Sequence, residues 1–400
     1  MKLGWSADGE AIESPFQVAI TGVGVVSSVG IGKEAFWSGI LNSSYSGSRL
    51  IDDFDPAQYM NVKEARRADR YNQLGLAASI LAMNDAGNPE INPAKAGVWM
   101  GTGVGGLTTL ESQILICHGR GPDRVSPFLV PMMMANSNAA TISMKFGFTN
   151  TCQTTATACA AGTQAIGNAA REISSGRATI MLAGGAEVAT TPTAIAGFDN
   201  MTAASPTATS RPFDAERNGF VMAEGAAVVV LEELSHAVAR GAHIYAIVAG
   251  YGSNADAHHI TAPAPHGAGA IACMERALED AGLTPSQIAH VNAHGTSTPL
   301  NDKGEAEAID KLFGATRPPV TSIKGALGHT LGAAGAIETV AACLTFENGI
   351  IPPTANTVNI DPEMNIDVVI GQPRKLGDGA IISNSFGFGG HNGSLVFTRP

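Results

Sequence analysis

The chain has 400 residues, of which 44% are hydrophobic and only 15% are charged. This length and composition indicate a large buried core, in two domains or one duplicated unit, and exclude a disordered chain. The net charge of −11 argues against a nucleic-acid binder, which needs a basic surface.

The five cysteines, Cys117, Cys152, Cys159, Cys273 and Cys343, are scattered and odd in number. They form no CxxC pair and no cluster with zinc-ligand spacing, so we predict no metal site and reduced thiols in a cytoplasmic protein. Residues 1–15 lack the basic and apolar regions of a secretory signal and are expected to be a loose extension. The sequence has no apolar run long enough to suggest a membrane span.

The first half begins with a strand-like, glycine-rich segment over residues 16–29, followed by a helix over 33–41. Gly22 and Gly24 follow the pattern of a dinucleotide loop only in part, because Ser27 stands where the third glycine is needed. A close strand-to-helix contact is the favoured interpretation. Apolar spacing predicts a helix over residues 67–86, and the buried run 96–101 predicts a strand. A loop with Pro127 and Pro131 comes next, then a helix from about residue 136.

Later elements alternate between strands and helices. A helix is expected from about residue 160 to 175, strands over 178–183 and 225–231, and a helix over 234–240. The second half begins near residue 242 with a strand. It continues with helices over 268–281, 302–313 and 335–347, and with strands ending at 294 and over 380–383 and 394–398. This alternation indicates α/β layers, and a duplicated fold is plausible although no residue-level repeat is visible.

Cys159 is the candidate nucleophile, because it directly precedes the predicted helix over 160–175. Unpaired N–H groups and the positive end of the helix dipole favour a thiolate there, and the same N–H groups can stabilise an oxyanion. For an isolated cysteine, a buried apolar role is the commoner alternative.

Two histidines in the second half lie beside glycines in predicted turns. His294 lies in NAHGTSTP, which ends a strand, and His329 lies in SIKGALGHTLGAAG, with Lys324 five residues before it. Taken singly, either histidine is more often a structural hydrogen-bonding residue than a catalytic one.

Five ordered motifs then identify a family resemblance from about residue 16 to the C-terminus. They are TACAAG, SRPFDAERNGFVMAEGA, NAHGTSTPLND, SIKGALGHTLGAAGAIE and NSFGFGGHNGS. The chain resembles condensing enzymes of the thiolase superfamily, specifically the β-ketoacyl-(acyl carrier protein) synthase I/II type. The resemblance implies an α/β, thiolase-like duplicated fold with five α-β-α-β-α layers. Its halves would span residues 16–241 and 242–400.

The resemblance also implies roles for the residues of these motifs. Cys159 would hold the acyl group, and His294 and His329 would stabilise the enolate formed when a malonyl unit loses CO2. Lys324 would orient and electrostatically tune His329, with Glu338 as its charge partner, although a purely structural pair is an equal alternative for Glu338. The N–H groups of Cys159 and Phe388 would form a second oxyanion hole, and Phe388 would act as a mobile gate.

Substrate and partner contacts follow from the same resemblance. Thr296 and Thr298 match positions that bind the pantetheine arm, and Val104 and Phe198 match walls of the acyl pocket. The basic residues Lys63, Arg66, Arg67 and Arg70, at helical spacing, match the docking region for an acyl carrier protein. A solvated helix face is the simpler alternative for these four.

The resemblance implies no cofactor, a partner carrier in acyl and malonyl forms, and a homodimer or a heterodimer with a chain-length factor. Two departures from the family pattern, Ala161 in place of a hydroxyl residue and a short loop between Phe198 and Ser210, concern carrier choice and chain length. The competing hypothesis is a scaffold subunit of a heterodimeric polyketide synthase. A degradative thiolase is disfavoured because the C-terminal motif lacks a second cysteine.

Overall fold

The computed structural model describes residues 1–5, 11–14, 16–45 and 49–400. The first half contains one sheet with the strand order β6-β5-β7-β8-β3. Its members are β3 (Val18–Ser27), β5 (Ala96–Gly101), β6 (Cys152–Thr155), β7 (Ile180–Glu187) and β8 (Gly225–Glu233). β5 runs parallel to β6 and β7, whereas β8 runs antiparallel to β7 and β3.

The second half repeats this arrangement strand for strand. Its order is β11-β10-β15-β16-β9, with β10 parallel to β11 and β15, and β16 antiparallel to β15 and β9. The strands are β9 (Ala246–Ala255), β10 (Ile288–Asn292), β11 (Pro319–Thr321), β15 (Ala380–Gly387) and β16 (His391–Thr398). The same order and directions in both halves mark a duplicated fold, and a short β3–β9 pairing joins the two sheets.

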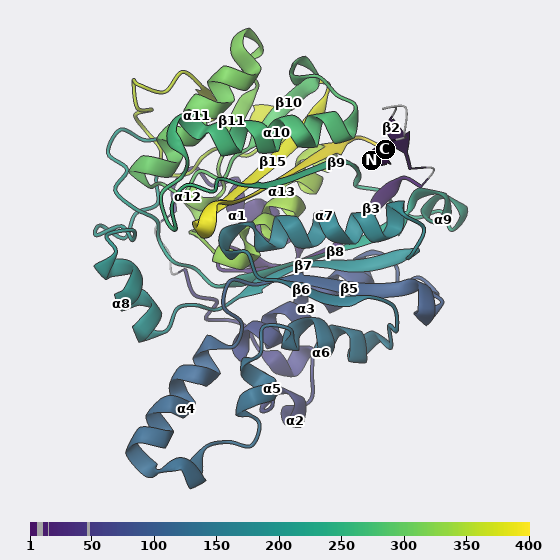
Figure 1. The fold of residues 1–400 in the computed structure, drawn as a ribbon, viewed down its shortest axis with the longest axis vertical. Coiled ribbons are helices and arrows are strands. Elements are labelled where there is room, and N and C mark those ends of the chain that lie inside the picture. Colours follow the sequence, from purple (N-terminus) through teal and green to yellow (C-terminus); the bar gives the residue numbers. More distant parts are fainter. Residues whose placement is uncertain (6–10, 15, 46–48) are drawn as a thin grey trace.

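Helices separate and cover the two sheets, which gives five layers (Figure 1). The layer between the sheets holds α7 (Ala161–Ser174) and α13 (Ala334–Asn348). The outer layers hold α3 (Arg70–Asp85) and α6 (Ser137–Phe146) on one side, and α10 (Ala268–Ala281) and α11 (Pro299–Phe313) on the other. The five-layered thiolase-like prediction therefore agrees with the observed fold.

Burial explains the composition of the central layer. Residues 334–346 of α13 are all buried, and they are apolar or small around most of the helix, as expected for a helix enclosed on every side. The glycines of the GVG segment have a packing role, as predicted. A Cβ on Gly24 would lie 2.5 Å from the backbone nitrogen of Ala82, so β3 and α3 approach at backbone contact.

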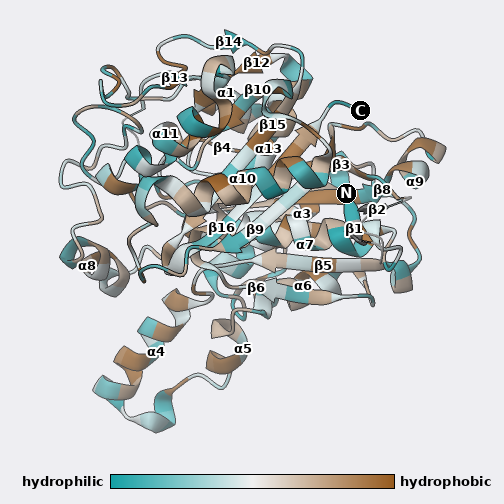
Figure 2. Ribbon diagram, turned by 45° about the horizontal axis from the view of Figure 1, so that its top comes forward, coloured by the Kyte–Doolittle hydropathy of each residue, from teal (hydrophilic) through white to brown (hydrophobic). Residues whose placement is uncertain are grey.

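A projecting arm contradicts the loop predicted between residues 106 and 136. It consists of α4 (Leu107–Arg120) and α5 (Leu129–Met133), and it extends away from the layers (Figure 2). Ile114 and Leu115 on α4 are more than half exposed. Pro127 lies in the connection between the two helices. Pro131 lies in the first turn of α5, where its missing N–H costs no helical hydrogen bond.

The helix predicted over residues 67–86 is observed as α3, which begins at Arg70, and a separate short helix precedes it. Asn61 caps α2 (Val62–Ala65) together with Glu64, and Asp69 caps α3, so the chain turns between them. The N-terminal extension also differs from the loose segment expected. Its described residues form a hairpin of β1 (Lys2–Trp5) and β2 (Ala11–Glu13), and the backbone N–H of Lys2 donates to Asp280.

The remaining elements are short or lie at the edges. They are α1 (Lys33–Ile40), α8 (Pro192–Asn200), α9 (Leu234–Ala239), α12 (Lys324–Leu327), β4 (Gly30–Ile31), β12 (Ile350–Ile351), β13 (Asp367–Val368) and β14 (Arg374–Lys375). In the described part of the chain, every helix is too short or too polar to span a membrane.

Candidate active site

Cys159 lies in a tight turn between β6 and α7. Ala158 has a left-handed backbone with φ of 49°, an uncommon conformation for a residue with a Cβ, and it turns the chain into the short helical segment Ala158–Ala160. The thiol is 8% exposed and stands just before the N-terminus of α7, as predicted.

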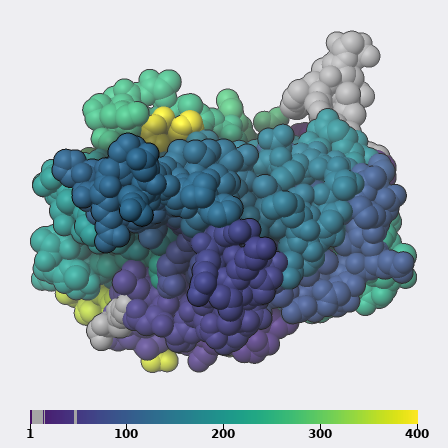
Figure 3. Space-filling model, turned by 90° about the horizontal axis from the view of Figure 1, so that it is seen from below, coloured from purple at the N-terminus to yellow at the C-terminus, as the bar shows by residue number. Residues whose placement is uncertain are grey.

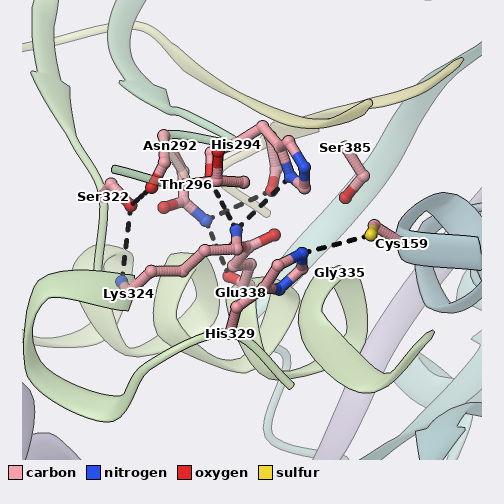
Figure 4. Close-up of polar contacts among 12 residues, drawn as sticks. Cys159, Asn292, His294, Thr296, Ser322, Lys324, His329, Gly335, Glu338 and Ser385 are labelled. Atoms are coloured by element: carbon pink, nitrogen blue, oxygen red, sulfur yellow. Dashed lines mark hydrogen bonds and ion pairs between the residues drawn. The ribbon is translucent and has the colours of Figure 1, made fainter. Parts of the chain in front are cut away.

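His329 lies shortly before α13 in the second half, two residues ahead of the short helical segment Leu331–Ala333 that leads into this helix. Its backbone is fixed to the neighbouring segment, because its N–H donates to Val221 (2.7 Å) and its carbonyl accepts from Ala223 (3.0 Å). Its Nε2 lies 3.1 Å from the sulfur of Cys159, and its Nδ1 accepts from the N–H of Leu331 at 3.3 Å (Figure 4). Because Nδ1 is an acceptor, the proton of the neutral ring is on Nε2.

His294 follows β10, and two buried carboxylates fix its turn. Glu305 accepts from the N–H groups of His294 (2.8 Å) and Gly295 (2.7 Å), and Asp302 accepts from Thr296 (2.9 Å). Both acids come from α11, so this helix positions the whole turn. The sequence analysis missed the role of Glu305, although acidic residues in the first turns of a helix after a glycine-rich turn are a usable signal.

Lys324 contacts His294 and not His329, which corrects the predicted arrangement. Its ammonium donates to the carbonyl of His294 at 2.6 Å, lies 3.4 Å from Nδ1 of the same ring, and forms a buried ion pair with Glu338. Figure 4 shows the Lys324 side chain lying between these groups. Nδ1 of His294 therefore faces a donor, which leaves its Nε2–H directed away from the lysine.

The three candidate groups meet at one point. The sulfur of Cys159 and one ring nitrogen each of His294 and His329 all lie within 4.8 Å of one another. The centres of the two imidazole rings are 5.4 Å apart, and the ring planes make an angle of 81°. Residues more than a hundred positions apart are thus brought within reach of one substrate.

Burial controls the charges of this site. It raises the pKa of the Cys159 thiol to about 12, while the Lys324 ammonium and the N–H groups of Phe388 and Cys159 oppose the rise. Burial and Lys324 hold the pKa of both histidines well below the usual value, so both imidazoles are neutral. The resting sulfur is therefore mainly a neutral thiol, whereas the helix dipole alone had suggested a thiolate.

One cysteine and two histidines at these distances also resemble a set of metal ligands. In metal sites the ring nitrogen that does not bind the metal usually donates to a carboxylate or carbonyl. Here the Nδ1 atoms of His294 and His329 face donors instead. The Nε2 atoms consequently carry protons, which suits hydrogen-bond donation to an oxyanion better than coordination.

A cavity of about 470 Å³ surrounds the three groups. Its lining includes the five expected pocket residues Val104, Phe198, Thr296, Thr298 and Phe388. The hydroxyls of Thr296 and Thr298 are 2.9 Å apart. Phe220, which packs against both Phe198 and His329, also lines the cavity and was not singled out, although it lies in one of the quoted motifs.

Phe388 lies on a glycine-rich turn between β15 and β16. Gly389 and Gly390 have positive φ values of 82° and 72°, which a residue with a Cβ adopts at a cost. The turn is held to a neighbouring loop, because the N–H of Gly389 donates to Ile260 at 2.6 Å. The N–H of Phe388 points at the sulfur of Cys159, as a second oxyanion hole requires.

The expected docking residues do not share one helix. Lys63, Arg66 and Arg67 are exposed around the end of α2. Figure 3 shows the purple N-terminal segments beside the blue segments that follow them in the chain. Arg67 lies over the ring of Phe128 from the arm, 4.4 Å from its centre. Arg70 instead begins α3 and makes two hydrogen bonds to the buried carboxylate of Glu224, at 2.9 and 2.6 Å, so its charge is paired although its side chain stays 33% exposed.

Comparison with known proteins agrees with this geometry. Residues 48–237 match the family described as "Beta-ketoacyl synthase, N-terminal domain", and residues 245–358 match its C-terminal domain. A 3-oxoacyl-[acyl-carrier-protein] synthase 2 of Synechocystis sp. is 42% identical, over 96% of this chain and 98% of its own length.

Solved structures give the same result. The ishigamide ketosynthase/chain length factor has a TM-score of 0.91 and 33% identity, covering 96% of this chain and 99% of its own. A type II PKS ketosynthase, in complex with its acyl-carrier protein and bound to the hexaketide, has a TM-score of 0.89 and 32% identity, covering 96% and 100%. The chain therefore belongs to the β-ketoacyl synthase family.

Proposed function

We propose that this chain is a 3-oxoacyl-(acyl carrier protein) synthase that extends an acyl chain by decarboxylative Claisen condensation. One observation carries the proposal: a buried thiol and two neutral imidazoles, each with its Nε2 proton free to donate, meet in a single cavity. This set combines a nucleophile with two oxyanion donors.

In the first step, Cys159 attacks the thioester carbonyl of the acyl carrier. The new carbon–sulfur bond replaces the one to the carrier, and the thiol proton leaves with the carrier sulfur. The N–H groups of Cys159 and Phe388 both point at the nucleophile and are suited to hold the oxyanion that forms. Because the pKa of the thiol is about 12, the thiolate forms only when an acceptor for its proton is present.

In the second step, a malonyl thioester occupies the cavity and its carboxylate leaves as CO2. The electron pair of the broken carbon–carbon bond moves onto the thioester oxygen as an enolate, which accepts from Nε2–H of His294 and His329. Lys324 acts as a positioning residue for His294, and Glu338 balances the lysine charge. The enolate carbon then attacks the acyl carbonyl on Cys159. The tetrahedral intermediate collapses to the 3-oxoacyl product and releases the sulfur as a thiolate, which takes up one proton from water to restore the resting thiol.

We propose an acyl carrier protein as the macromolecular partner. The exposed Lys63, Arg66 and Arg67 offer local positive charge on an acidic chain, and Thr296 and Thr298 are suited to bind the pantetheine arm. Arg70 is removed from this docking set because Glu224 neutralises it. The ketosynthase 32% identical to this chain was solved with its carrier bound, which supports this partner.

The assembly and location are proposed in the same way. We propose a homodimer first and a heterodimer with a chain-length factor second, because one close structure is a ketosynthase/chain length factor. Five free cysteines support a cytoplasmic location. We set the boundary between the halves at residues 241 and 242, between α9 and β9.

The decisive experiment incubates the pure protein with acyl and malonyl carriers and measures 3-oxoacyl product. Mass spectrometry should find the acyl group on Cys159, and Cys159→Ala should abolish both the adduct and the product. Acyl transfer that persists in this variant would refute the assignment. A folded wild-type protein that never becomes acylated would favour the scaffold hypothesis.

A further inference from the structure

Glu187 is a buried carboxylate close to the reacting groups that the proposed steps do not use. It ends β7 and its residue is fully buried. Three other buried glutamates, Glu224, Glu232 and Glu338, each pair with a lysine or arginine, whereas Glu305 is held by the backbone N–H groups of the His294 turn. Glu187 forms no ion pair with any of the described residues, and neutral donors alone satisfy its two oxygens.

These donors come from two separate segments. Oε1 accepts from the hydroxyl of Thr102 at 3.1 Å and from the N–H of Val104 at 3.4 Å, and Oε2 accepts from the N–H groups of Gly103 and Gly332, the latter at 3.1 Å. One carboxylate thus joins the turn after β5 to the turn before α13.

Gly103 and Gly332 lie so close to this carboxylate that neither position has room for a side chain. A Cβ on Gly103 would lie 2.7 Å from Oε2 of Glu187, and one on Gly332 would lie 2.6 Å from the same atom. Both approaches are shorter than non-bonded carbon–oxygen contacts allow. The carboxylate therefore occupies a close-fitting socket.

Both joined segments belong to the reaction site. The first carries Val104, which lines the cavity. The second begins at His329 and includes Leu331, whose N–H donates to Nδ1 of that histidine, and Gly332 is the next residue. By holding Gly332, Glu187 fixes the donor that determines which nitrogen of His329 carries the proton.

We propose that Glu187 is a positioning residue that fixes the tautomer and orientation of His329 by holding Gly332 and the Thr102–Val104 turn to the end of β7. This inference rests on the proposed function of His329 as an oxyanion donor. Glu187 also acts on the nucleophile through its charge, because the carboxylate is one of the groups that raise the pKa of Cys159. Burial raises the pKa of Glu187 itself to about 7, while its four donors favour the ionised form.

The first test compares Glu187→Gln with the matched control Glu232→Gln. Glutamine has nearly the same volume, so the variant is expected to fold, but its NH2 cannot accept a hydrogen bond. Whichever oxygen it replaces, an N–H donor loses its acceptor, either Val104 or the pair Gly103 and Gly332, so the amide cannot hold both segments. Glu232 is an equally buried acid on the adjacent strand β8, at the far end of the sheet, where it pairs with Arg240. Its variant tests for a general effect of removing a buried charge.

We expect kcat for condensation to fall by about 10- to 100-fold in Glu187→Gln, because an oxyanion donor is displaced, while KM for the malonyl carrier changes little. The control is expected to lower the melting temperature without a change in kcat. Wild-type kcat in Glu187→Gln, or an equal loss in both variants, would overturn the proposal.

The second test measures the tautomer of His329 directly and does not depend on enzymatic activity. In protein labelled with ¹⁵N-histidine, the ring nitrogens of His329, assigned by comparison with His329→Ala, should report the Nε2–H tautomer. Glu187→Gln should shift this signal toward a mixture of the two tautomers, whereas the control Glu232→Gln should leave it unchanged. An unchanged tautomer in Glu187→Gln would refute the positioning role, whereas absent condensation in the wild type with this tautomer intact would refute only the proposed function.

Discussion

Replacement of Lys324 by methionine tests both the stability and the chemistry of the site. The lysine side chain is 1% exposed and that of Glu338 is 2% exposed, so Lys324→Met leaves a carboxylate buried without its cation. Removing one partner of such a pair costs about 3–5 kcal/mol in the free energy of unfolding. The cost arises mainly from the unpaired carboxylate, because methionine fills most of the lysine volume.

The same change should impair His294. Its carbonyl loses a donor at 2.6 Å and its Nδ1 loses the ammonium at 3.4 Å, so the ring is no longer held with Nε2–H toward the cavity. Loss of one oxyanion donor lowers kcat by about 10²–10³-fold, and we expect a decrease of this order for condensation.

The measurements are urea unfolding and steady-state condensation for Lys324→Met, Glu338→Gln and the double variant. The double variant should regain much of the lost stability, because it no longer buries an unpaired charge, yet it should stay inactive. If it is no more stable than Lys324→Met, or if Lys324→Met unfolds like the wild type, the reasoning about the buried pair is wrong.

Four further predictions concern other parts of the chain. His329→Ala should lose decarboxylation of the malonyl carrier while Cys159 still becomes acylated; loss of acylation would move His329 to the first step. Alkylation of Cys159 by iodoacetamide should accelerate about tenfold per pH unit between about pH 7 and 10, because the raised pKa keeps the thiolate fraction small and growing. A plateau near pH 8 would contradict that pKa. Gly24→Ala should lower the free energy of unfolding by about 1–3 kcal/mol, since the new Cβ overlaps the backbone of α3, and a variant as stable as the wild type would show that the helix can withdraw. Arg67→Glu should raise KM for the carrier with little effect on kcat, whereas an unchanged KM would leave Arg67 a solvated surface residue.

The sequence predicted the elements whose residues carry strong local signals. The apolar period of residues 268–281 matches α10 at both ends, and the buried run 96–101 matches β5. Cys159 at the start of a helix was also correct, because alanines and isoleucines at helical spacing follow it directly. The prediction that Cys159, His294 and His329 lie together rested on the family resemblance, because no local sequence pattern reports contacts between residues so far apart in the chain.

Predictions failed where a contact depends on the fold rather than on spacing. Lys324 is five residues from His329 and thirty from His294, but the short helix α12 directs its side chain to the more distant histidine. Arg70 has the helical spacing of a docking cluster, yet Glu224, far away in sequence, takes up its charge. The arm formed by α4 and α5 was missed because its prolines suggested a loop and its apolar side chains are partly exposed.

The repeated strand order has a consequence for how the enzyme becomes competent. α7 and α13 are counterparts in the two halves and share one layer, and the turns at their beginnings supply the sulfur and one imidazole. During synthesis, a chain released only as far as residue 241 already carries the thiol but lacks both rings and the cover over α7. Condensation therefore requires both copies of the fold, because the second copy supplies the two imidazoles and the N–H of Phe388 at the sulfur.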